Sequence, residues 1–370
     1  MPAPPFDAAT ATTVTTTDGR SLVSFGGCNY HGLAHHPRVV RAAQDALARF
    51  GLSASASRET TGNARPHELL ERETAGFLGS ESALLVPDGY TANVAAAQAA
   101  ARTHGVAILD ERSHASLHDA AAAAGLHTLV HRHGDADQAA AMVAAHAEHG
   151  IVMMVDGVFA ADGRIARLRE LLAALPQDGL LIVDDCHGFL TLGQDGRGTA
   201  SHLGLHDPRI ALTTTLAKGL GCAGGIVAGQ HCFIERARRA TAYVCTTPTP
   251  PALAEAAREG LRVMRDEPWR LERLRDNASR LRAHAVRLGL AVCPDPTPII
   301  TFTLGTRDDM EHARATLTAA GFRVPLIDYP GGPAPTYFRL MVSSEHTPDQ
   351  IDSLAAALAG AISRPIRAAS

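Results

Sequence analysis

The sequence predicts an α/β protein with a mostly parallel β-sheet, and three features of one region carry this prediction. Between residues 83 and 229 the apolar runs are short, they are continuous, and they alternate with stretches of helical composition. A continuous apolar run is typical of a strand that is buried on both faces. Strands that alternate with helices form parallel sheets covered by helices on both sides.

Six strands and three of the intervening helices are expected in this region. The strands span 83–89, 106–110, 151–159, 180–185, 210–216 and 224–229, and the helices span 91–102, 114–125 and 167–177. Parallel sheets bind ligands at the carboxyl ends of their strands. The informative side chains should therefore follow these runs directly.

The two ends of the chain predict further parts. Residues 1–20 are rich in Thr, Ala and Pro and are expected to be extended or loosely ordered, before a helix at 37–50. A proline-rich stretch at 246–256 predicts a boundary. Beyond it we expect one amphipathic helix at about 252–288, strands at 297–304, 322–328 and 337–344, and helices at 307–320 and 348–362. The predicted organisation is an N-terminal segment 1–48, a large domain 49–248 and a smaller α+β domain 249–370.

Composition excludes several classes of protein. The 34 basic and 38 acidic residues are interspersed and aromatics make up 4%, so there is no basic patch for nucleic acid. No apolar run approaches the roughly 18 residues of a membrane span, and the first residues lack the features of a signal peptide. Six cysteines without a CxxC pair suit a reducing compartment. We expect a cytoplasmic enzyme without a metal site.

Only one of the 34 basic residues is a lysine, Lys218. Arginine replaces lysine poorly where an amine must lose its proton or form an imine. Lys218 follows an apolar strand, which places its amine in a partly desolvated position suited to Schiff-base chemistry. A surface lysine without function is the plainer alternative on composition alone.

Other polar residues follow the ends of the predicted strands. Gly89 lies at a strand-to-helix turn, where backbone N–H groups favour an anion such as phosphate. His114 could stack on a flat ring or simply begin a helix. Asp184 and Asp185 end a buried strand, and one of them could serve only as a helix cap. A protonated pyridine nitrogen is a known partner for such an aspartate.

A GxGxxG spacing at Gly219, Gly221 and Gly224 needs weighing as a dinucleotide site. The motif requires a helix directly after the glycines, because the helix N-terminus binds the pyrophosphate. The segment that follows here predicts a strand. We therefore do not expect a dinucleotide cofactor.

Taken together, six motifs resemble one family. VPDGYTAN, DERSHASLHDA, DGVFAADGRIARL, IVDDCHGFLTLGQDGRG, TTTLAKGLG and FRLMVSSEHTPDQID occur in the order and spacing of the α-oxoamine synthases, which are fold-type-I pyridoxal-phosphate enzymes. The resemblance covers the chain from about Asp18 onward. It implies a fold-type-I transferase with a large domain and a smaller C-terminal domain.

The resemblance implies roles for individual residues. Lys218 would form the internal aldimine with pyridoxal 5'-phosphate, Asp184 would pair with the pyridine nitrogen, His187 would bind the ring hydroxyl and His114 would stack on the ring. The residues implied to hold the phosphate are Thr215, Gly89, Tyr90 and, from a neighbouring subunit of a homodimer with shared sites, Thr247. Arg339 would bind the carboxylate of the amino-acid substrate. In the family a quinonoid carbanion then attacks an acyl thioester, carried on CoA or on an acyl carrier.

Departures from the family pattern gather where the second substrate is expected. Cys28 and His31 flank Asn29 near the expected substrate site, and Ala160 replaces a serine. The segment YPGGPAP at 329–335 lies where the family carries an acyl-binding loop, and we expect the chain to lack most of the family's leading helix, which helps to bind the acyl-CoA. Two interpretations remain open: drift within a true synthase, which is slightly favoured, or an enzyme with an unusual or absent acyl donor. In the second case it would be a lyase, racemase or aminotransferase. A non-catalytic binding protein is disfavoured, because the lysine, aspartate and histidine set is complete.

Overall fold

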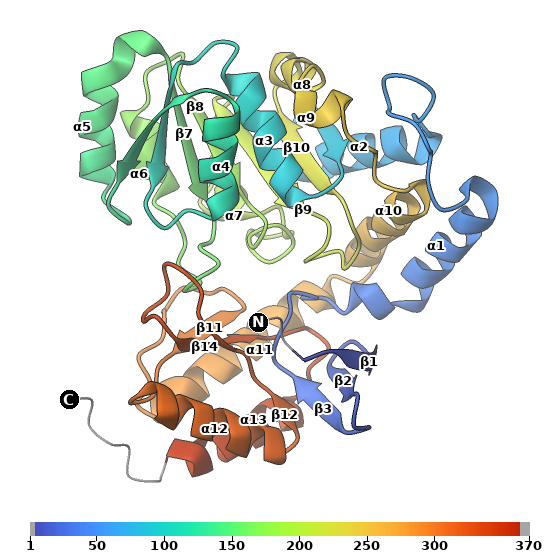
Figure 1. Ribbon diagram of the computed structural model, residues 1–370, viewed down its shortest axis with the longest axis vertical. Helices are drawn as coiled ribbons and strands as arrows, with labels where there is room; N and C mark the ends of the chain where they lie inside the picture. The colour runs from blue at the N-terminus through green and yellow to red at the C-terminus, as the bar shows by residue number, and fades with distance from the viewer. Residues whose placement is uncertain (1–3, 363–370) are drawn as a thin grey trace. The chain divides into compact units, whose positions relative to one another are not determined.

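The computed structural model describes residues 4–362, which fall into two compact units (Figure 1). One unit, called here the sheet unit, comprises residues 36–159 and 165–267. The other, called the terminal unit, comprises the described residues of 1–35, 160–164 and 268–370. No helix within residues 4–362 is both long enough and apolar enough to cross a membrane.

A seven-stranded mixed sheet forms the centre of the sheet unit. Its strands lie in the order β4 (Ser82–Val86), β10 (Gly225–Gly229), β9 (Ile210–Thr215), β8 (Leu180–Asp184), β7 (Ile151–Asp156), β5 (Val106–Asp110) and β6 (His127–His131). The run from β9 to β6 is parallel, and β10 is antiparallel to both of its neighbours. The prediction of a mostly parallel sheet is confirmed, and the segment after the GxGxxG spacing is a strand.

Helices cover both faces of this sheet. Successive strand residues point to opposite sides, so each strand contributes apolar side chains to a core on either face. On β7, Val152 and Met154 join a core that includes residues of α3 (Gly89–Ala100), α4 (Ala115–Ala123), α8 (His231–Ala237) and α9 (Thr241–Val244). The alternate residues Met153 and Val155 pack with α5 (Ala136–His146) and α6 (Leu168–Ala174) on the other face. Figure 1 shows these two layers.

Three longer helices and one short helix complete the sheet unit. They are α1 (Pro37–Phe50), α2 (Arg65–Leu78), α7 (Thr199–His202) and α10 (Pro251–Asp266). α1 has the predicted bounds: Pro37 begins it, and Gly51 follows it with a φ of 72°. Proline at the first turn and glycine after the last are the usual boundaries of a helix.

The terminal unit combines two small sheets with three helices. The strands β1 (Phe6–Ala9), β2 (Thr13–Thr16) and β3 (Ser21–Ser24) form an antiparallel meander, and β12 (Phe322–Arg323) extends it in parallel to β3. The second sheet has the order β11 (Ile299–Phe302), β14 (Tyr337–Met341) and β13 (Leu326–Ile327). The helices are α11 (Trp269–Arg287), α12 (Arg307–Ala319) and α13 (Pro348–Ile362).

The expectation of one helix across about 252–288 is wrong. α10 ends at Asp266 and α11 begins at Trp269, so the break falls at Glu267 and Pro268. Proline lacks the N–H that an α-helix requires and disfavours helical geometry in the residue before it. Glu267 accordingly has φ −124° and ψ 62°. The amphipathic pattern continues across the break because both helices bury one face.

Candidate active site

The carboxyl ends of the parallel strands in the sheet unit gather the polar residues of the candidate site. β5 ends at Asp110, β7 at Asp156, β8 at Asp184 and β9 at Thr215. All four are buried in a sheet whose remaining strand residues are mostly apolar. Parallel strands end at one edge of a sheet, which is where such folds bind ligands.

Lys218 lies in the loop after β9, and its amine contacts a histidine from the loop after β8. The distance from Lys218 Nζ to His187 Nε2 is 2.8 Å. The His187 side chain is buried and Lys218 is half-buried. A lysine amine held against an imidazole has a group beside it that can exchange protons with it.

Asp184 accepts hydrogen bonds on both carboxylate oxygens. Asn93 Nδ2 donates to Oδ2 at 2.7 Å, and the Cys186 backbone N–H donates to Oδ1 at 3.0 Å. N–H donors on both oxygens hold the carboxylate in one orientation. Asp184 is therefore an oriented carboxylate at the end of a buried strand.

Asp185 has a structural environment. Its oxygens accept from the Thr199 hydroxyl at 2.5 Å and from the Thr199 backbone N–H at 2.9 Å, at the start of α7. A Cβ atom at Gly188 or Gly198 would lie within 2.0 Å of this carboxylate, so glycine is required at both positions. Burial raises the pKa of Asp185 to about 6, although the Thr199 donors act in the opposite direction.

Asp156 lies directly beside Asp184, because the two residues pair in register on β7 and β8. Burial and the neighbouring charge of Asp184 raise the pKa of Asp156 well above its usual range. Asp156 Oδ2 accepts the backbone N–H of His114 at 2.7 Å. Asp156 therefore holds a proton more readily than an ordinary aspartate does.

His114 is the N-cap of α4. Its Nδ1 atom lies 2.7 Å from the Ser116 hydroxyl and accepts the Ser116 backbone N–H at 3.2 Å. The same residue is thus held through its main chain by Asp156 and through its ring by Ser116. Both interpretations of His114 from the sequence remain compatible with this placement.

The turn into α3 presents backbone amides. Asp88 caps this helix by accepting the Thr91 N–H at 2.7 Å. Within residues 4–362, the N–H groups of Gly89 and Tyr90 have no acceptor. A Cβ atom at Gly225 would lie 2.0 Å from the Asp88 carbonyl oxygen, and one at Gly89 would lie 3.0 Å from Thr215 Cβ. Glycine therefore keeps the backbone of this turn close to β9 and β10.

This set of groups fits pyridoxal phosphate. The molecule carries an aldehyde that reacts with an amine, a basic ring nitrogen, a ring hydroxyl and a phosphate. The sheet unit offers a lysine amine, an oriented carboxylate, two imidazoles and an anion-binding turn. No group of three His, Cys, Asp or Glu side chains suited to a metal ion occurs within residues 4–362.

Thr215 and Thr247 differ in their surroundings. The Thr215 hydroxyl donates to the Gly224 carbonyl at 3.2 Å and accepts the Ala217 N–H at 3.2 Å. Thr247 is exposed in the segment after α9. Its neighbour Thr249 is buried instead, and its hydroxyl donates to the Val86 carbonyl at 3.1 Å.

The other predicted site residues lie in the terminal unit. Arg339 on β14 donates to the Ala160 carbonyl at 3.2 Å, and its guanidinium lies 5.1 Å from the centre of the Tyr329 ring. Cys28 is half-buried, and the Asn29 side chain accepts the Ala34 N–H at 3.3 Å. His31 is fully buried, which suits packing better than substrate binding.

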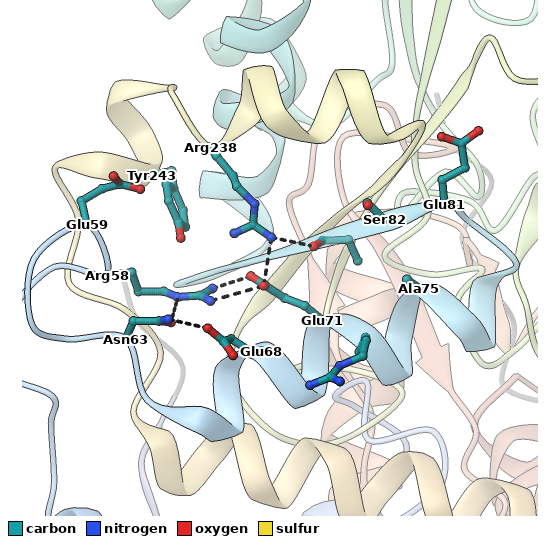
Figure 2. A pocket seen from close by; sticks show the side chains of 12 residues that line it. Arg58, Glu59, Asn63, Glu68, Glu71, Ala75, Glu81, Ser82, Arg238 and Tyr243 are labelled. Carbon is teal, nitrogen blue, oxygen red and sulfur yellow. Dashed lines mark hydrogen bonds and ion pairs between the residues drawn. The ribbon is translucent and has the colours of Figure 1, made fainter.

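A separate pocket of about 470 Å³ lies beside β4, the edge strand of the sheet (Figure 2). Glu71 at its centre pairs with Arg58 and, at 3.0 Å, with Arg238. Glu71 also accepts the Leu85 N–H at 2.8 Å. The side chains of Glu71, Arg58 and Arg238 are therefore paired with one another, and Glu71 also satisfies one backbone N–H at the free edge of β4. We interpret this cluster as structural.

Three residues of the site were not predicted from the sequence: Asn93, Asp156 and Ser116. Asn93 lies four residues after Gly89, so a helix places both on one face. That spacing was the available signal. Asp156 could have been inferred as the polar residue that ends a buried apolar strand.

Comparisons with known proteins give a consistent picture. The family described as aminotransferase class I and II matches residues 20–358. The 8-amino-7-oxononanoate synthase of Methylococcus capsulatus is 40% identical over 350 residues, covering 93% of this chain and 90% of the relative. The enzyme of the same name from Hahella chejuensis is 37% identical over 341 residues, which cover 91% of this chain and 86% of the relative.

Solved structures agree with these sequence comparisons. A serine palmitoyltransferase from S. paucimobilis with a bound PLP–myriocin aldimine superposes with a TM-score of 0.90 at 26% identity, covering 96% of this chain and 90% of that one. The Sphingomonas wittichii serine palmitoyltransferase superposes with a TM-score of 0.89 at 26% identity, and the match covers 96% of this chain and 90% of that one.

Proposed function

This chain belongs to the class I and II aminotransferase family and, within it, to the α-oxoamine synthases, and from this premise we propose that it condenses a small amino acid with an acyl thioester by means of pyridoxal phosphate. The observation that carries the proposal is the contact of Lys218 with His187, together with the oriented carboxylate of Asp184 at the end of strand β8. Lys218 is the one lysine of the chain.

The residues that would hold the cofactor come from four strand ends of the sheet unit. Lys218 would hold it covalently, Asp184 would accept from its ring nitrogen, His187 would bind its hydroxyl and His114 would lie against its ring. Gly89, Tyr90 and Thr215 would bind its phosphate. When bound, pyridoxal phosphate supplies an electron-withdrawing ring that stabilises negative charge next to the substrate amine.

The chain's own residues would then move the protons. Lys218 would take the proton from the substrate α-carbon at Nζ. His187 would receive or return a proton at Nε2, and this atom lies 2.8 Å from that amine. Arg339 would bind the substrate carboxylate through its guanidinium, a group suited to two parallel hydrogen bonds.

A homodimer with shared sites is part of the proposal. Apolar side chains exposed on the sheet unit support an interface: Val40, Leu47, Leu52 and Tyr90. The exposed Thr247 would reach the phosphate bound by the neighbouring copy.

Mixing Lys218→Ala with Thr247→Asp tests this arrangement. If subunits exchange, about a quarter of the parent activity should return, since each mixed dimer has one intact site. No recovery after demonstrated exchange would exclude shared sites.

The proposed location is the cytoplasm. All six cysteines are free thiols in the structure, which suits a reducing compartment. Cell fractionation followed by immunoblotting tests this, and recovery in the extracytoplasmic fraction would contradict it.

The function is tested with the purified protein. It should bind pyridoxal phosphate with a visible absorption band that Lys218→Ala abolishes. With alanine, glycine or serine it should release free thiol from an acyl-CoA only when both substrates are present. Product formed from the amino acid alone, with no response to any thioester, would instead indicate a lyase, racemase or aminotransferase.

A further inference from the structure

A chain of hydrogen bonds joins the two groups on which the cofactor would rest. Asn93 on α3 is buried at its centre. Its Nδ2 atom donates to Asp184 Oδ2 at 2.7 Å and to the Ser116 hydroxyl at 2.8 Å. Its Oδ1 atom accepts from the Thr213 hydroxyl at 2.5 Å. All polar atoms of this amide are therefore engaged.

The orientation of the amide follows from its partners. A flipped Asn93 would bring Oδ1 against the Asp184 carboxylate, two acceptors facing each other. Thr213 on β9 holds the correct orientation by donating to Oδ1. Both protons of Nδ2 are then committed, one to Asp184 and one to Ser116.

This orientation favours one tautomer of His114. Because the Ser116 hydroxyl accepts from Asn93, its own proton is available to His114 Nδ1, 2.7 Å away. The Ser116 backbone N–H also donates to Nδ1. Two donors on Nδ1 leave the ring proton on Nε2.

We propose that Asn93 is a positioning residue that, through one side-chain amide, holds the Asp184 carboxylate in place and favours the Nε2–H tautomer of His114. The inference rests on the proposed function, because that function gives Asp184 and His114 a cofactor to hold. The hydrogen bonds themselves lie within the sheet unit and can be tested with or without the cofactor.

The experiment compares Asn93→Leu and Thr213→Val with a matched control, Asn277→Leu. Asn277 is also a buried amide, but it donates to the carbonyls of Ser343 and His346 in the terminal unit. Thr213→Val keeps the size of the side chain and removes the donor that orients Asn93. It serves as the second variant if Asn93→Leu does not fold.

Two readouts separate positioning from simple loss of stability. The first is the affinity for pyridoxal phosphate, which should fall at least about tenfold in Asn93→Leu and less in Thr213→Val. The pH midpoint of the visible absorption should shift in the same variants. The second is the nitrogen NMR signature of the His114 ring, assigned by comparison with His114→Gln. It should report Nε2–H in the parent and a mixture in both variants.

The control Asn277→Leu should lower the melting temperature and leave both readouts unchanged. Cofactor affinity within twofold of the parent, together with an unchanged His114 signature in Asn93→Leu and Thr213→Val, would overturn the inference. A parent protein that does not bind pyridoxal phosphate would overturn the proposed function, while the His114 signature would still decide the role of Asn93.

Discussion

Asp184 and Asp185 are consecutive in the chain, yet their carboxylates bind different parts of the sheet unit. Asp184 accepts from Asn93 on α3, and Asp185 accepts from Thr199 at the start of α7. Adjacent residues at a strand end point to opposite sides. One carboxylate therefore lies toward the candidate site, and the other holds the loop between β8 and α7.

We expect Asp184→Asn to impair catalysis strongly and Asp185→Asn to leave it nearly unchanged. Asp184→Asn removes the carboxylate acceptor, so cofactor affinity should fall at least about tenfold and kcat by about 100-fold or more. Asp185→Asn should keep kcat within about threefold of the parent. Cofactor titration and steady-state kinetics measure both. Equal losses in the two variants would contradict the assignment of Asp184.

The stability of the protein should depend on pH through Asp185. Burial raises the pKa of Asp185 in the folded state to about 6, against about 3.9 for an unfolded aspartate. The folded state therefore binds more protons between these values, and this group's contribution to the free energy of unfolding falls as pH rises through them. The cost at neutral pH is roughly 3 kcal/mol.

Asp185→Asn removes this cost, because the amide does not titrate. The difference in unfolding free energy, variant minus parent, should rise by up to roughly 3 kcal/mol between pH 4 and pH 7. Urea unfolding across this range measures it, and other titrating groups cancel in the difference. A difference independent of pH would show that Asp185 does not titrate in this window.

Arg339 should govern binding of the amino acid and not of the cofactor. Its guanidinium has no carboxylate partner within residues 4–362. Arg339→Ala should raise the KM for the amino acid about 10- to 100-fold. Arg339→Lys should recover only part of this lost binding, because lysine lacks the planar guanidinium fork. Kinetics with varied amino acid and a separate cofactor titration test this. Equal weakening of both would make Arg339 structural.

Glu71 should be important for stability. Glu71→Gln would leave the buried Arg58 and the partly buried Arg238 without their shared counter-charge. We expect a loss of about 3 kcal/mol in unfolding free energy. The control Glu59→Gln, an exposed residue of the same pocket, should change it by less than about 0.5 kcal/mol. Similar values for both variants in urea unfolding would contradict the structural interpretation of the cluster.

The parts of the fold that the sequence predicted well are those where burial leaves a clear pattern. β5 has the predicted bounds because all five of its residues are buried. β6 was not predicted, since His127–His131 lies at the edge of the sheet and exposes part of its side chains. The break before α11 depends on Pro268, a single residue inside a longer amphipathic pattern.

The candidate site shows the same limit. Strand ends pointed to Asp184, Asp185, His187 and Lys218, because a polar residue after a buried run is conspicuous, and the choice of Asp184 over Asp185 came from the family resemblance. Asn93 acts through partners on β8, β9 and α4, and those contacts exist only after the chain has folded. Local sequence carries the position of such a residue on its helix but not the identity of its partners.

The single lysine also makes this protein a natural subject for amine chemistry. Apart from the terminal amine, Lys218 carries the only primary amine of the chain, and it lies against His187 at the proposed centre. An amine-directed reagent would therefore label one interior position, with the terminal amine as its one competitor. Mass spectrometry of the intact chain would then count occupied and vacant centres directly, even in a crude mixture of loaded and unloaded protein.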